Sequence, residues 1–73
     1  MSTLDVIEEM NDKIEQLGPL TKETCQKNMD IVRGAIASLE KCPADKLRDD
    51  MLQATREQLV ATFQVCAWKA KSE

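Results

Sequence analysis

Apolar residues recur along the chain in alternating steps of three and four, the spacing that places side chains on one side of an α-helix. The first series is Ile7, Met10, Ile14 and Leu17, with Leu4 and Val6 at its edge. Ser2 is a favoured N-cap residue and Asp5 stands at the capping-box position. Gly18 and Pro19 end the series, because Gly is common just after a helix and Pro cannot continue one. The pattern predicts a helix over residues 3–17.

A second series repeats these steps over two heptads, as in a coiled-coil seam. Its members are Cys25, Met29, Val32, Ile36 and Leu39, widened by Ile31 and Ala35. With Thr21 as the cap, the series predicts a helix over residues 22–41. Gly34 lies in the middle of this helix, where Gly costs about 1 kcal/mol relative to Ala. Either the helix tolerates this cost, or another backbone approaches closely at Gly34.

The stretch Lys41-Cys42-Pro43-Ala44-Asp45 is the clearest place for the chain to turn back on itself. Pro43 disfavours helical geometry at Cys42 and suits the first position of a new helix. Asp45 then falls in the first turn, where the helix dipole favours a carboxylate. A connection this short makes the flanking helices antiparallel neighbours.

The third apolar pattern predicts a long helix over residues 44–70. Leu52, Leu59 and Cys66 repeat every seven residues, joined by Thr55, Phe63 and Ala70. A second strip holds Leu47, Met51, Ala54, Val60 and Ala67, so apolar surface winds around the helix. This helix is longer than the helix over residues 22–41, so its end from Phe63 to Ala70 has no partner in the hairpin. We therefore expect one small all-α domain over residues 1–73: an antiparallel helical hairpin preceded by a shorter helix, which could cover that end.

The composition favours a folded domain. A hydrophobic content of 42 % excludes a highly charged disordered chain, and an aliphatic core with few aromatic residues suits helices. The net charge of −3 is concentrated in residues 1–20, which sum to −4 and favour a basic partner surface. Lys and Arg on the two long helices alternate with acids, so attraction to nucleic acid or anionic lipid has no evident source. No apolar stretch approaches the roughly 20 residues that span a bilayer, and we expect a soluble, cytoplasmic protein without a membrane partner.

Catalysis and metal binding find no support in the residue types. The chain has no His, so a nucleophilic Cys would lack its usual base. Three cysteines, an odd number without C-x-x-C spacing, are expected to stay reduced, with Cys25 and Cys66 as buried small hydrophobes. Cys42 in the turn could be exposed, but nothing nearby activates it. The cysteines are too far apart for a zinc site, and adjacent Asp49 and Asp50 point about 100° apart on a helix. We therefore expect no enzyme, cofactor or metal.

Association through helices remains as the function. Winding apolar surface, unequal helix lengths and a small core all call for additional burial. The residues expected to contact a partner are Leu59, Val60, Phe63, Cys66, Ala67, Trp68 and Ala70. The alternatives are that Phe63 belongs to the hairpin core and that Trp68 packs against the first helix. The partner would be another helical protein or a second copy, and a homodimeric regulator that binds RNA is the alternative function.

The stretch Ile36-Ala37-Ser38-Leu39-Glu40-Lys41-Cys42-Pro43-Ala44-Asp45 combines a helix end, a short polar turn and a helix entry. With a short first helix before it, this layout over residues 1–70 resembles the small co-chaperones of type III secretion needle subunits (the YscE/EscE/SsaE-like group). The stretch from Val60 to Lys71 is less aromatic than that group leads one to expect. The resemblance implies a partner, a helical-repeat chaperone, with which the protein would hold a needle subunit soluble in the bacterial cytoplasm.

Overall fold

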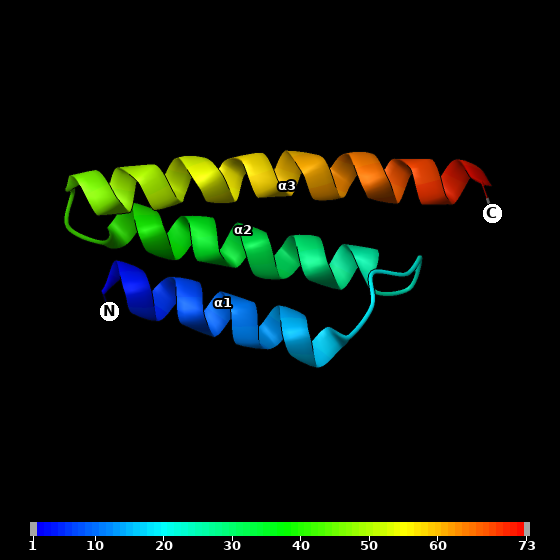
Figure 1. The fold of residues 1–73 in the computed structure, drawn as a ribbon, viewed down its shortest axis with the longest axis horizontal. Helices are drawn as coiled ribbons and strands as arrows, with labels where there is room; N and C mark the ends of the chain where they lie inside the picture. Colours follow the sequence, from blue (N-terminus) through cyan, green and yellow to red (C-terminus); the bar gives the residue numbers. More distant parts are fainter. Residues whose placement is uncertain (1, 73) are drawn as a thin grey trace.

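Three helices form a bent layer in the computed structural model, which describes residues 2–72 (Figure 1). They are α1 (Thr3–Leu17), α2 (Cys25–Lys41) and α3 (Lys46–Ser72). α2 lies in the middle and runs antiparallel to both neighbours, which contact each other much less. The Cα atoms span 42 × 20 × 13 Å. The all-α fold and the antiparallel hairpin are confirmed, with α2 beginning three residues later than predicted and α3 shifted by two residues at each end.

α1 has the predicted bounds, set by side-chain capping and by a glycine. The Asp5 amide donates to Ser2 Oγ at 3.2 Å, and the Ser2 amide donates to Asp5 Oδ2 at 3.5 Å, which completes a capping box. Gly18 ends the helix with φ 77° and ψ −152°, a conformation that is essentially restricted to glycine. The buried side consists of Thr3, Val6 and Met10. Val6 is thus in the middle of the buried side of α1 and not at its edge, because the side of α1 that faces α2 is rotated toward Val6.

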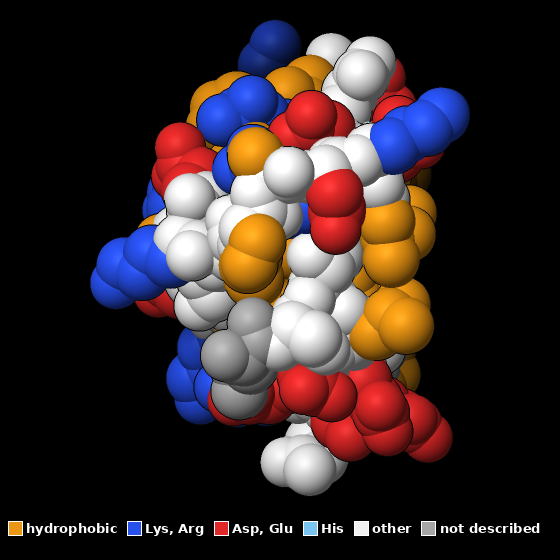
Figure 2. Space-filling model, turned by 90° about the vertical axis from the view of Figure 1, so that its left-hand side faces the viewer, with side chains coloured by type: hydrophobic (Ala, Val, Ile, Leu, Met, Phe, Trp, Pro, Cys, Tyr) orange, Lys and Arg blue, Asp and Glu red, His pale blue; other side chains and the backbone are white. Residues whose placement is uncertain are grey.

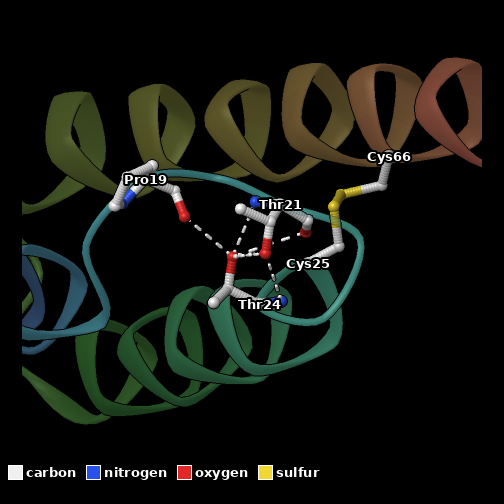
Figure 3. The surroundings of a disulfide bond; sticks show 5 residues. All are labelled: Pro19, Thr21, Thr24, Cys25 and Cys66. Atoms are coloured by element: carbon white, nitrogen blue, oxygen red, sulfur yellow. Dashed lines mark hydrogen bonds between the residues drawn. A yellow bond between two sulfur atoms is a disulfide. The ribbon is translucent and has the colours of Figure 1, made fainter.

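A hydrogen-bonded turn leads into α2 (Figure 3). The Thr21 amide donates to Thr24 Oγ1 at 2.8 Å, and the Thr24 amide donates to Thr21 Oγ1 at 3.3 Å. The Thr24 hydroxyl also lies 3.0 Å from the Pro19 carbonyl oxygen, to which it donates. Thr21 therefore caps a preliminary turn, and its carbonyl accepts from the Cys25 amide at 2.9 Å. This extra turn is why α2 begins at Cys25.

Asp45, and not Pro43, sets the start of α3. The Arg48 amide donates to Asp45 Oδ1 at 2.7 Å, the geometry of an N-cap side chain. Pro43 therefore lies in the connection, two residues before the cap, and α3 begins two residues after the predicted start at about residue 44. Cys42 is buried, contrary to the expected exposure, and its thiol donates to the Ser38 carbonyl at 3.4 Å.

The core lies in the half of the layer that contains the α2–α3 connection. Leu39 and Val32 are fully buried at its centre. The cluster is completed by Val6, Met10, Ala35, Cys42 and Leu52. Thr55 is also buried, and its hydroxyl donates to the Met51 carbonyl at 2.6 Å, which satisfies the polar group within the helix.

A disulfide joins Cys25 and Cys66, so the prediction that these cysteines stay reduced is wrong. Their Cα atoms are 5.9 Å apart, within the range that a disulfide spans. Cys25, Val32 and Leu39 repeat every seven residues along α2, and Leu52, Leu59 and Cys66 repeat every seven residues along α3. In each series the cysteine is the residue farthest from the α2–α3 connection. The two seven-residue series run in opposite directions from the turn, so the hairpin brings their outer members together. This matching of the series is the sequence signal that points to the bond.

Candidate interaction surface

The distal half of α3, residues 59–72, is the least covered part of the layer. The buried residues of α3 are Leu52 and Thr55, both before this segment. Four of the six exposed large hydrophobic side chains of residues 2–72 lie within it, namely Val60, Phe63, Val65 and Trp68. Apolar side chains thus reach solvent where the core has ended, as expected for a surface that another protein covers.

One apolar line in this segment, which we call the Phe63 stripe, consists of Val60, Phe63, Ala67 and Ala70. Their spacings of three, four and three place them on one side of the helix. All four are exposed, with 57 % of Val60 and 59 % of Phe63 open to solvent. The alternative that Phe63 belongs to the hairpin core is therefore wrong.

Trp68 lies on another side of α3. Trp68 follows Phe63 by five positions, an offset that places the two side chains about 140° apart around the helix. Trp68 shares its side with Ala61 and Val65, at spacings of four and three. It is 65 % exposed, and α1 lies across α2 from α3, so the alternative of packing against α1 is also wrong (Figure 1). The expected single face is thus divided between two sides.

Two of the residues expected at a partner surface point inward instead. Leu59 packs against the core, and Cys66 is half-buried in the disulfide with Cys25. The accessible part of the predicted site is therefore the Phe63 stripe together with Trp68. Helical geometry alone separates these groups, since Leu59 and Cys66 are seven residues apart on the side that carries Leu52.

A hollow lies between α1 and α2, with a volume of about 380 Å³. Gly34 lines it beside Val6, Met10 and Ala35. A methyl group added at Gly34 would meet nothing within 4 Å, so no backbone of this chain approaches there. The rim carries an exposed ion pair between Lys13 and Glu9 at 3.0 Å. The hollow is open to solvent, and Asp30 and Ser38 also line it.

Charge is distributed unevenly over the layer. Acidic side chains gather over α1, at the bottom of Figure 2, as the sequence indicates. α2 and α3 instead carry mixed charges, and Arg56 Nη2 and Glu40 Oε2 lie 3.5 Å apart between them. These ion pairs are exposed, so each contributes little to stability. Within residues 2–72, five of the ten basic side chains form ion pairs with acids, namely Lys13, Arg33, Lys46, Arg48 and Arg56.

The adjacent acids Asp49 and Asp50 pair with different basic residues. Asp49 pairs with Arg48 at 2.9 Å and Asp50 with Lys46 at 3.3 Å, so the two carboxylates serve different partners. Among residues 2–72, no three His, Cys, Asp or Glu side chains are grouped so that they could hold a metal ion. Over the same range, no helix combines the length and apolar character needed to cross a bilayer.

Comparison of the chain with protein-family models, curated proteins and solved structures finds no match. The functional assignment therefore depends on the surface itself.

Proposed function

We propose that this protein is a non-enzymatic helical adaptor that binds another helical protein through the distal half of α3. The observation that carries the proposal is the Phe63 stripe, an exposed apolar line at helical spacing beyond the core. A line with anchors at i, i+3, i+7 and i+10 suits insertion of this helix face into an apolar groove of a partner. Ala67 and Ala70 are small, so the partner's backbone can approach α3 closely there.

The binding mechanism is burial of apolar surface. Covering a Phe or Val side chain contributes about 1.5–3 kcal/mol each. Association costs at least about 4 kcal/mol in lost freedom of motion, so the stripe needs support from neighbouring contacts. Trp68 supplies a second anchor if the partner wraps around α3, since Trp is enriched at binding hot spots.

The finer proposal is a co-chaperone that works in the bacterial cytoplasm with a helical-repeat chaperone of a type III secretion needle subunit. Its support is the layout of a short helix followed by a hairpin with a Pro-marked turn. The acidic side chains over α1 lie across α2 from the Phe63 stripe and favour a basic surface elsewhere on a partner that also reaches α1. The helical-repeat chaperone as partner and the bacterial cytoplasm as compartment are part of this proposal and rest on the resemblance alone.

A second copy of the chain is the alternative occupant of the stripe, because an apolar line on a straight helix can pair with itself in antiparallel fashion. This version corresponds to the homodimeric regulator, with RNA as its ligand. Light scattering on the isolated chain distinguishes the two versions, since only the second gives a dimer that Phe63→Asp dissociates. A gel-shift titration across salt concentrations tests RNA binding, which requires affinity that falls steeply with salt.

The experiment that tests the proposal is affinity capture from the native cell with wild type, Phe63→Asp and Leu4→Asp. Leu4 is the matched control because it is a similarly exposed apolar residue, 62 % open, on α1. We expect wild type and Leu4→Asp to retain one helical partner in stoichiometric amount and Phe63→Asp to lose it. Retention of the same partner by folded Phe63→Asp and Val60→Asp proteins would contradict the proposal.

A further inference from the structure

The distal half of α3 is held to the rest of the layer by few contacts. Its inward residues Leu59, Thr62, Cys66 and Lys69 are only half-buried. α2 begins at Cys25, opposite Cys66, so α3 continues past the end of its neighbour (Figure 1). The disulfide is therefore the last strong attachment along α3, and it lies next to the exposed apolar residues.

The two ends of this disulfide differ in how firmly they are held. Cys25 is buried and follows the turn built by Thr21 and Thr24, whose hydrogen bonds fix it from the preceding residues (Figure 3). Cys66 belongs to a segment in which no side chain is fully covered. If the bond breaks, Cys25 stays in place and the segment that contains Cys66 loses its anchor.

The position of the bond also suits its reduction by a dithiol. A thiolate of the dithiol attacks Cys66 Sγ, the sulfur of the less buried residue, and the electron pair of the S–S bond passes to Cys25 Sγ. This leaving thiolate forms in the first turn of α2, where the helix dipole favours a negative charge. The second thiolate of the dithiol then attacks the mixed disulfide and releases Cys66. Each protein sulfur takes up a proton, and the dithiol leaves as a disulfide.

The third cysteine cannot replace either partner. Cys42 follows the opposite end of α2, about 25 Å from Cys25 along a helix of 17 residues. It is buried, with its thiol directed to the Ser38 carbonyl. The Cys25–Cys66 pair therefore has two states, bonded or reduced, without internal exchange.

We propose that the Cys25–Cys66 disulfide is a redox latch for the distal half of α3. When oxidised, it fixes residues 60–72 against the start of α2; when reduced by a dithiol, it releases this segment while the three-helix core stays folded. In the reducing compartment of the proposed co-chaperone function, on which this one point rests, disulfides are mostly transient or regulatory. This inference concerns the chain alone and does not depend on the identity of a partner.

Hydrogen–deuterium exchange tests the latch on the full chain, oxidised and after treatment with dithiothreitol. We expect exchange in residues 60–72 to rise by about tenfold or more on reduction, and by much more than exchange in α1 and residues 46–55. Cys66→Ser should show the fast exchange without reductant. Cys42→Ala is the matched control and should respond to dithiothreitol as wild type does.

Three results would overturn the inference. Unchanged exchange in residues 60–72 after reduction would mean that packing alone holds the segment. A uniform rise over all three helices would mean that the bond stabilises the whole fold and is not a local latch. Alkylation of all three cysteines in the denatured, air-oxidised protein would mean that the bond does not form.

Discussion

Cys25, the first residue of α2, is bonded to Cys66 on α3 across a sequence separation of 41. The bond closes the end of the hairpin that lies farthest from the Pro43 connection. Leu39 and Val32 fill the core in the half nearer the Pro43 connection, whereas the exposed Val60, Phe63 and Trp68 lie in the half nearer the disulfide. The architecture thus separates a packed half from a half that displays apolar side chains.

Reduction of this bond should lower the free energy of unfolding by clearly less than the roughly 4 kcal/mol that loop entropy in the unfolded chain implies, because the released segment also regains freedom in the folded protein. Urea titrations followed by circular dichroism, with and without dithiothreitol, measure the difference. Cys42→Ala, which keeps the bond, should show the same difference between the two conditions. A loss below about 1 kcal/mol would place the bond among those with little effect on stability.

Substitutions at Leu52 and Phe63 should differ strongly in their effect on stability, although both residues are apolar and belong to α3. Leu52→Ala removes buried side-chain volume and should cost about 2–5 kcal/mol of stability. Phe63→Ala changes an exposed side chain and should alter stability by about 0.5 kcal/mol or less. Thermal or urea unfolding of the two variants checks this contrast. A large loss of stability in Phe63→Ala would mean that Phe63 packs in the monomer and is not available to a partner.

The two glycines should respond differently to alanine. Gly34→Ala should stabilise the protein by about 0.5–1 kcal/mol, since the methyl group meets open space within a helix. Gly18→Ala should destabilise it by about 1–3 kcal/mol, because φ of 77° strains any other residue. Equilibrium unfolding measures both changes. If Gly34→Ala is stable but loses a bound partner, that partner's backbone approaches α2 at Gly34.

Asp45 should stabilise the start of α3 through its side-chain cap. Asp45→Ala removes the acceptor for the Arg48 amide and should cost about 1 kcal/mol. Asp45→Asn keeps a cap acceptor and should cost much less, which separates capping from charge. Urea unfolding of both variants provides the measurement. Equal losses in the two variants would indicate that the negative charge, and not the hydrogen bond, is what matters at this helix start.

The sequence was sufficient for the features that depend on local pattern. Gly18 with Pro19, and Pro43, mark the two connections, and the apolar series of α2 identifies Val32 and Leu39 as core residues. The features that sequence reasoning missed depend on how the helices meet. Val6 is central because α1 rotates to face α2, and α2 begins late because Thr24 pairs with Thr21.

Burial divides the candidate site for a similar reason. The predicted partner surface follows position along α3, whereas exposure depends on the side of the helix. Leu59 and Cys66 follow the inward series, and Phe63 and Trp68 lie on different outward sides. The pairing of Cys25 with Cys66 required matching one heptad series against the other, which the number and spacing of cysteines do not reveal.

The most direct test of the binding surface is photo-cross-linking in the native cell with a photoreactive phenylalanine analogue at position 63. The control is the same analogue at Leu4, exposed on α1. The account predicts a discrete cross-linked product, with another helical protein or a second copy, from position 63 but not from position 4, and its loss on adding Val60→Asp. Equal labelling from both positions, or a product that persists in Val60→Asp, would contradict the claim that the Phe63 stripe is the binding surface.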